Sequence, residues 1–190
     1  MKNKLKITWN SPVILTFVAI CLAATALNYI TGGKSNAIFF MTYHSSLKSP
    51  MTYVRLFSHV FGHANWSHFI GNMSYILLLG PLLEEKYKSQ TLIEVIAIAA
   101  LITGLVNYIF FPHVALCGAS GVVFAFMLLA SFTSFKEGEI PLTFLLVAVF
   151  FIGQQIIQGL TLDDNVSNMA HIVGGIVGGW CGYLLNRKTV

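Results

Sequence analysis

Charged side chains are scarce in this chain of 190 residues, since Asp, Glu, Lys and Arg together make up only 9% of it. An average soluble domain has about 25%. Hydrophobic residues reach 56% and the mean hydropathy is +0.74, so the charges are too few to cover the surface of a soluble globule of this size. The same composition excludes disorder, which requires low hydrophobicity and high charge.

Cysteine is also rare, and its placement excludes two further classes of protein. Cys21, Cys117 and Cys181 lie in apolar runs without regular spacing, which argues against both a disulfide framework and a metal knuckle. The net charge of +4 would suit nucleic acid, but the basic residues do not gather in one patch. We therefore expect no nucleic-acid partner, no metal and no cofactor.

Long apolar segments take the place of the missing charge. A bilayer core of about 30 Å requires about 20 residues of helix. The sequence predicts an all-α membrane protein with one domain over residues 1–190 and six transmembrane helices, at 12–30, 66–83, 91–111, 115–135, 140–157 and 169–185. Polar residues interrupt segment 31–65 too often for it to cross the bilayer as a helix. Its short apolar runs favour a membrane-embedded outer loop.

The Lys and Arg residues predict the orientation of these helices. With the N-terminus inside, eight of the 11 lie on the inner side, so we expect both termini in the cytoplasm. A competing interpretation is a cleaved signal peptide, because a Lys-rich start and an apolar run precede Ala24-Thr25-Ala26. The run continues to Ile30, which favours an uncleaved helix.

Four polar side chains from three predicted helices share one depth, about 5–10 Å below the outer surface. His68 and Asn72 are four residues apart and so lie on one helix face. Ser120 lies near the outer end of segment 115–135, and His171 near the outer end of segment 169–185. Polar groups inside a bilayer are costly and usually functional, so this convergence indicates a site.

Small residues suggest how two of these groups meet. Glycines follow His171 at +3, +4, +7 and +8 on the same helix face, namely Gly174, Gly175, Gly178 and Gly179. Such a face allows close helix contact, and if the partner is segment 115–135, then Ser120 and His171 lie together.

A serine beside a neutral histidine is an activated nucleophile, and the histidine can pass the proton on to a leaving amine. His68, Asn72 and the backbone N–H of Ser120 are candidate donors to the oxygen that becomes negative. Phe124, one turn from Ser120, is placed to stack on the imidazole.

Each of these residues alone has a plainer explanation. The hydroxyl of a serine in a membrane helix commonly donates a hydrogen bond to a carbonyl one turn back. Asn72 taken alone would be explained by a hydrogen bond that holds two helices together. His59, His63 and His68 leave a metal site open, although no acid or cysteine completes it. A polar-cavity transporter would need ionisable groups in the inner helix halves, which are apolar.

Taken together, the motifs resemble those of the rhomboid intramembrane serine proteases, most closely the compact bacterial GlpG type. The matching residues are Arg55, His59, His63, His68, Asn72, Glu84, Gly118-x-Ser120-Gly121 and Ala170-His171. The resemblance implies Ser120 as nucleophile, His171 as general base, and His68 and Asn72 as oxyanion stabilisers. It implies supporting positions at Gly118, Gly121, Phe124, Ala170, His63 and Arg55.

The resemblance also implies a function and a place. The expected activity is hydrolysis of a peptide bond in or beside the transmembrane segment of another membrane protein, near the outer face of a bacterial inner membrane. Helix 140–157 and loop 159–168 would form the gate and cap. Two departures stand out, since the family usually has Tyr at Phe124 and Trp-Arg at Val54-Arg55. The non-enzyme alternative is a catalytically silent module that binds membrane proteins.

Overall fold

The computed structural model describes residues 7–133, 139–161 and 168–187, which are helical apart from their connections and one isolated pairing of Thr42 with Leu116. The elements are α1 (Pro12–Ile30), η1 (Asn36–Phe40), α2 (Pro50–Ser58), η2 (His59–Phe61), α3 (Trp66–Tyr87), α4 (Ser89–Phe110), α5 (Ser120–Ser131), α6 (Leu142–Thr161) and α7 (Asn168–Arg187). The predicted all-α class therefore agrees with the described part of the chain.

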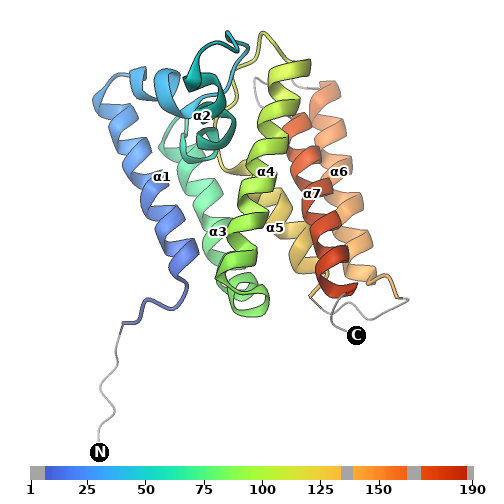
Figure 1. The fold of residues 1–190 in the computed structure, drawn as a ribbon. Coiled ribbons are helices and arrows are strands. Elements are labelled where there is room, and N and C mark those ends of the chain that lie inside the picture. The colour runs from blue at the N-terminus through green and yellow to red at the C-terminus, as the bar shows by residue number, and fades with distance from the viewer. Residues whose placement is uncertain (1–6, 134–138, 162–167, 188–190) are drawn as a thin grey trace, which may run out of the picture.

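The longer helices run roughly alongside one another, with α1 at one side and α6 at the other (Figure 1). Length and apolar composition mark α1 and α4 as candidate membrane spans in the described residues. Large apolar side chains also face outward elsewhere, for example Leu78 on α3, which is 65% exposed. Apolar surface on this scale suits a lipid environment. The count of six spans stays a prediction.

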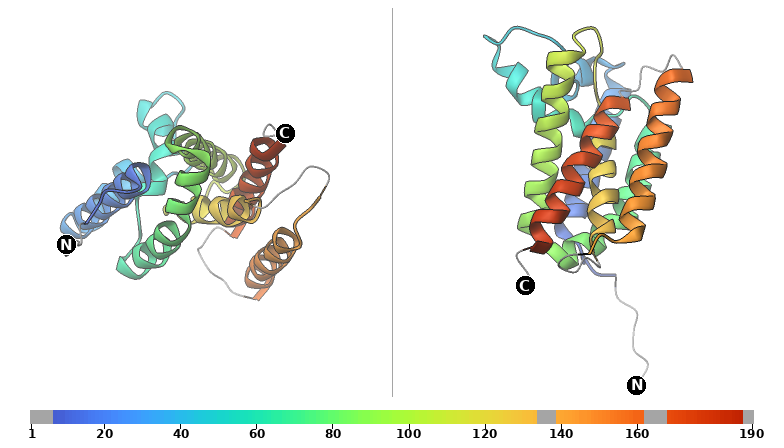
Figure 2. Two further views of the ribbon diagram at one scale, coloured as in Figure 1. Left: turned by 90° about the horizontal axis from the view of Figure 1, so that it is seen from below. Right: turned by 90° about the vertical axis from the view of Figure 1, so that its right-hand side faces the viewer.

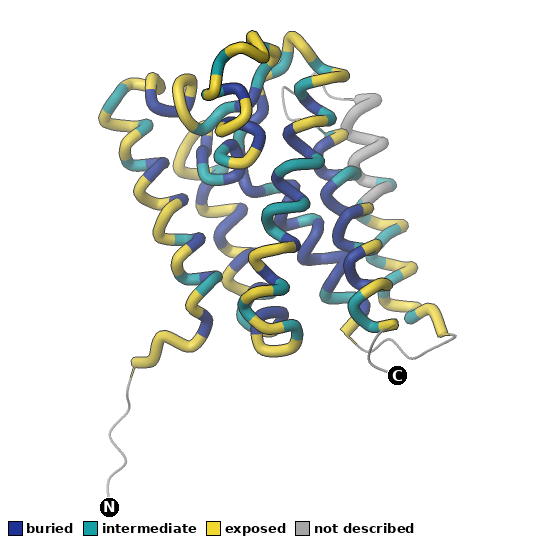
Figure 3. The backbone as a smooth tube through the Cα atoms, in the orientation of Figure 1, coloured by how far each residue is buried: buried dark blue, intermediate teal, exposed yellow. Residues whose placement is uncertain are grey.

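The short helix α5 forms the centre of the bundle. Most of its residues are buried, including Val122, Ala125 and Phe126 with no exposed surface (Figure 3). It contacts α3, α4, α6, α7 and η2, so it has five neighbouring elements. A helix surrounded in this way is apolar all round, as its sequence is.

The predicted helix 115–135 is wrong at its start, because α5 begins only at Ser120. Leu116 exchanges two backbone hydrogen bonds of 2.9 Å with Thr42, and the Gly118 N–H donates to the His59 carbonyl at 2.9 Å. Gly118 has a φ of +130°, which a side chain would strain. Since the outer loop satisfies these backbone groups, residues before Ala119 need no helix. The helix ends at Ser131, and residues 134–138 lie outside the described range.

The other predicted spans differ from the observed helices by smaller amounts. Helix α3 continues past the last apolar residue, Leu83, to Tyr87, because Lys88 with a φ of +72° is what ends it. Helix α6 lies two residues later at its start than predicted, beginning at Leu142 just after Pro141. Hydropathy marks where side chains become polar, which is not where backbone hydrogen bonding stops.

Arg55 organises the outer loop rather than the cavity described below. Its Nε donates to the Met51 carbonyl at 3.1 Å and its Nη1 to the Ala37 carbonyl at 3.5 Å. The guanidinium lies 4.4 Å from the centre of the Tyr43 ring, a cation–π contact. Arg55 therefore ties η1, α2 and the intervening strand-like segment together.

A buried carboxylate joins three helix ends at the opposite side of the molecule from this loop. Glu84 near the end of α3 accepts hydrogen bonds from the Val13 and Ile14 N–H groups of α1, at 3.1 and 3.2 Å. It also accepts from the Ser89 hydroxyl at the start of α4, at 2.7 Å. Unpaired N–H groups in the first turn of α1 thereby gain an acceptor.

Helices α5 and α7 make the closest contact in the bundle, through glycine. A Cβ on Gly174 would lie 2.2 Å from the Gly121 carbonyl oxygen, and one on Gly178 would lie 2.0 Å from the Ala125 carbonyl oxygen. Neither distance is possible, so only glycine permits this approach. The four predicted glycines do not all face α5, because Gly179 lies against the Phe144 ring of α6.

Helix α6 packs in a different way. It is set off from the bundle in the view from below, where it lies beyond α5 and α7 (Figure 2). Aromatic rings fill the space between, with Phe144 at 4.3 Å from Phe132 and Phe151 at 5.4 Å from Phe124, measured between ring centres. Side chains, not backbones, therefore make this contact.

Candidate active site

A cavity of about 600 Å³ opens between α3, α5, α6 and α7, a size typical of ligand sites. Its lining includes His68 and Asn72 from α3, Ser120 from α5 and His171 from α7. The structure thus brings the four polar residues predicted from depth alone into one cavity.

Helix α3 presents its two polar side chains from a capped first turn. The Asn65 Oδ1 accepts from the His68 N–H at 2.8 Å, which fixes the start of the helix next to His68. Asn72 follows one turn later, and its buried Nδ2 has no hydrogen-bond partner among the described residues. A buried donor without a partner is costly, so this amide is ready to bind an acceptor in the cavity.

Gly118 brings the chain before α5 against this face of α3. A Cβ at this position would lie 2.8 Å from the His68 Nε2 and 3.6 Å from the Asn72 Nδ2. Any side chain at Gly118 would therefore fill the space between the two donors and Ser120. This contact explains physically why the predicted supporting position is a glycine.

Ser120 is the first residue of α5 and is half-buried at the cavity wall. First-turn N–H groups of a helix have no intrahelical acceptor and carry the positive end of its dipole. Ser120 therefore lines the cavity at a helix start that favours negative charge.

His171 is held flat against an aromatic ring. The Phe124 and His171 rings are 4.6 Å apart and 7° from parallel, which is the predicted stacking contact. Gly121, which follows Ser120, lies against α7, where a Cβ would be 3.6 Å from the Ala170 carbonyl oxygen. Gly121 and Ala170 thus set the spacing between the two helices.

His63, the remaining supporting candidate, does not line the cavity. It is fully buried, with its Nδ1 3.2 Å from the Phe61 carbonyl and its ring 5.2 Å from that of His68. Burial lowers the pKa of His63, and of His59 in the same loop, to about 4. Both rings are therefore neutral near pH 7. His63 packs beside His68, whereas His59 lies against Thr103 of α4.

The metal alternative gains no support from the described part of the chain. Both ring nitrogens of His59 already have protein partners, since Nδ1 lies 3.2 Å from the Arg55 carbonyl in the loop and Nε2 3.3 Å from the Thr103 hydroxyl on α4. Over the described residues, no group of three or more His, Cys, Asp or Glu side chains is placed to hold a metal.

Eight residues of the cavity wall were not predicted from the sequence: Ala64, Asn65, Ser67, Gly71, Tyr75, Val123, Met127 and Phe151. Tyr75 lies three residues after Asn72, and Met127 three after Phe124, so helical spacing from the predicted residues would have found both. Phe151 carries no such signal, because nothing in α6 shows which of its apolar faces turns inward.

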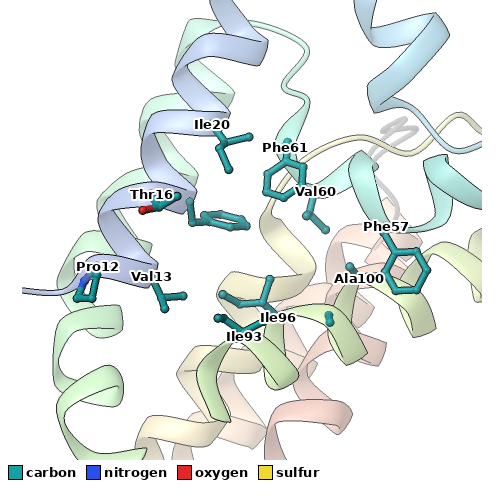
Figure 4. Close-up of a pocket in the computed structure, with 12 residues that line it drawn as sticks. Pro12, Val13, Thr16, Ile20, Phe57, Val60, Phe61, Ile93, Ile96 and Ala100 are labelled. Atoms are coloured by element: carbon teal, nitrogen blue, oxygen red, sulfur yellow. The ribbon is translucent and has the colours of Figure 1, made fainter. Parts of the chain in front are cut away.

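A second cavity, of about 470 Å³, lies between α1, α4 and the outer loop (Figure 4). Val13 and Ile20 of α1 face Phe61 and Ile96 across it. Thr16 is the one polar side chain in its lining. This apolar cavity offers no group for chemistry, so the polar cavity is the candidate active site.

Comparison with known proteins agrees on one family. The family model described as Rhomboid domain matches residues 50–188. The chain is 28% identical over 182 residues to rhomboid protease GlpG of Haemophilus influenzae, which covers 94% of this chain and 92% of that protein. It is 30% identical over 145 residues to rhomboid-related protein 1 of Caenorhabditis elegans and 31% over 158 residues to rhomboid-related protein 2 of Mus musculus. The matches cover 72% of this chain in both cases, but only 41% and 52% of those two longer proteins.

Proposed function

This chain belongs to the rhomboid family, and we propose that it is a serine endopeptidase that cleaves other membrane proteins within the bilayer. The observation that carries the proposal is one cavity whose wall combines a serine, a histidine and two further hydrogen-bond donors from three helices. The chain is an integral membrane protein, as its apolar helices and outward-facing apolar side chains indicate. We place it in a bacterial inner membrane with six spans and both termini in the cytoplasm.

The proposed reaction begins with Ser120. Its Oγ attacks the carbonyl carbon of the scissile peptide while His171 takes the hydroxyl proton. The carbonyl oxygen becomes negative in the tetrahedral intermediate and accepts hydrogen bonds from Asn72, His68 and the Ser120 N–H. When the C–N bond breaks, His171 gives its proton to the leaving amine and an acyl-enzyme remains on Ser120. Water then releases the acyl group by the same steps.

The proposed machinery is a Ser120–His171 dyad. The described residues that line the cavity include no Asp or Glu. The Phe124 ring contributes to the orientation of the imidazole through its parallel contact with His171. This division of roles is a proposal that rests on the ring geometry.

The proposed substrate is a transmembrane segment near the outer face. A helical peptide bond hides its carbonyl in the i to i−4 hydrogen bond, so the segment must unwind before attack. Glycine and other poor helix formers lower that cost. We therefore expect cleavage to favour segments with small or helix-breaking residues beside the scissile bond.

Labelling with a fluorophosphonate probe tests the nucleophile directly. The purified parent protein in detergent should be labelled, while Ser120→Ala and His171→Ala should lose labelling and keep their thermal stability. Ser131→Ala is the matched control, since that hydroxyl lies on the same helix and bonds the Met127 carbonyl at 3.0 Å. Undiminished labelling of Ser120→Ala would refute the proposal. A folded parent that is never labelled would favour the catalytically silent binding module.

The donors are tested separately by turnover. Asn72→Ala should lower kcat by about 10²–10³-fold with residual activity, since it removes one oxyanion donor. Cleavage of a transmembrane substrate in liposomes gives the rate, and its KM should change little. An unchanged kcat would remove Asn72 from the machinery.

A further inference from the structure

Three aromatic rings form a series that runs from α6 to the proposed base. Phe151 on α6 meets the Phe124 ring edge-on, with 5.4 Å between ring centres and 85° between ring planes. Phe124 on α5 in turn stacks on His171 of α7, at 4.6 Å and 7°. All three residues line the same cavity.

The middle ring of this series has no polar atom. A tyrosine could fix its own plane through a hydroxyl hydrogen bond, but the phenyl ring of Phe124 has neither donor nor acceptor. Its plane depends on packing alone, and the ring is only half-buried. The Phe151 and Phe124 rings meet nearly at right angles, an arrangement that aromatic pairs prefer.

From this geometry we infer that Phe151 is a positioning residue for His171, which acts through Phe124. The inference rests on the proposed function and extends it to a residue on α6. With Phe151 in contact, Phe124 keeps the plane that holds the imidazole flat and ready to accept the Ser120 proton. With Phe151 withdrawn, Phe124 is free to turn, and the imidazole loses the parallel contact that this ring gives it.

The inference links the position of α6 to the chemistry. Helix α6 touches α5 and α7 through side chains, so it can shift without breaking a backbone contact. Any shift that separates Phe151 from Phe124 would lower the reactivity of Ser120. Catalysis then requires α6 to be seated against the bundle after substrate has entered.

The test compares variants of Phe151 by the rate at which the fluorophosphonate probe labels Ser120. Phe151→Ala and Phe151→Leu should each lower this rate about tenfold or more, because alanine and leucine both lack the ring, although leucine keeps apolar bulk. Phe151→Tyr keeps the ring and should stay within about twofold of the parent. Phe150→Ala is the matched control, since that neighbouring side chain is 71% exposed and should leave the rate unchanged.

Two further measurements separate positioning from other roles. In substrate cleavage, Phe151→Leu should lower kcat with KM nearly unchanged. Phe124→Ala should mimic Phe151→Ala, and the double variant should be no slower than Phe124→Ala alone, because both act on one imidazole. Thermal stability of each variant identifies any loss that comes from unfolding.

The possible outcomes are distinct. Parent-like labelling of Phe151→Leu would overturn the inference, as would fully additive losses in the double variant. A raised KM with parent-like kcat would show that Phe151 contacts substrate instead. Failure of the parent itself to be labelled would count against the proposed function and not against the role of Phe151.

Discussion

Helix α5 is held by two neighbours in opposite ways. Toward α7, glycines bring the two backbones into direct contact, so that a Cβ on Gly178 would lie 2.0 Å from the Ala125 carbonyl oxygen. Toward α6, the rings of Phe144 and Phe151 stand between the helices. A Cβ on Gly153 of α6 would meet no atom of the described residues within 4 Å. The first contact fixes a distance, whereas the second can be remade by changes of rotamer.

The difference between the two contacts shows which part of the molecule fixes the relative positions of the candidate catalytic residues. Ser120 and His171 lie on the two helices of the glycine contact, so their relative position follows from the closest packing in the bundle. The aromatic contact lies on the side where α6 would have to give way to a bulky substrate segment. Enzymes that enclose their substrates commonly combine rigidly placed catalytic residues with a neighbouring element that can move.

The largest expected effect is at the glycine contact. Gly178→Ala places a methyl group on the Ala125 backbone, which cannot move aside as a side chain can. We expect the free energy of unfolding to fall by about 3 kcal/mol or more and labelling of Ser120 to be lost. Thermal unfolding in detergent measures the first quantity. A Gly178→Ala protein with the stability of the parent would show that the α5–α7 contact is no tighter than the contact with α6.

A smaller effect is expected at the aromatic contact. Phe144→Ala removes a partly buried ring that packs on Phe132, so the free energy of unfolding should fall by about 1–2 kcal/mol. Labelling of Ser120 should remain within severalfold of the parent, because the glycine contact is untouched. Complete loss of labelling in a folded Phe144→Ala protein would show that the two contacts are not independent.

The smallest effect is expected at Gly153, the matched control for Gly178. Gly153→Ala adds a methyl group in open space on α6 and improves helix propensity. The free energy of unfolding should be unchanged or rise by up to about 1 kcal/mol. A marked loss of thermal stability would mean that α6 packs more tightly than its described contacts indicate.

Much of the candidate site could be predicted because helical spacing is a local property. The four-residue step from His68 to Asn72 and the glycines after His171 define faces without any knowledge of the fold. The start of α5 could not be predicted, because residues 115–119 are apolar whether helical or extended. Their conformation depends on the pairing of Leu116 with Thr42, more than 70 residues away.

The face of α6 that packs against the bundle could not be predicted from the sequence either. An apolar helix without a polar face gives no sign of which side meets the bundle. Phe151 therefore became visible only in the structure, and Gly182, which packs on the Phe132 ring, lay beyond the predicted glycines. The contacts of Phe151 and Gly182 both depend on packing between helices that are distant in the sequence.

The Glu84 carboxylate carries a consequence for the order of assembly. Its partner Ser89 is five residues away, so this bond can form as soon as the α3–α4 turn exists. Its other partners, the N–H groups of Val13 and Ile14, lie about 70 residues earlier in the chain. During synthesis, α1 is therefore made well before Glu84, and the N–H groups of its first turn gain this acceptor only after residue 84 has been added. The start of α1 becomes fixed by a carboxylate that the Ser89 hydroxyl also holds, once the α3–α4 turn has formed.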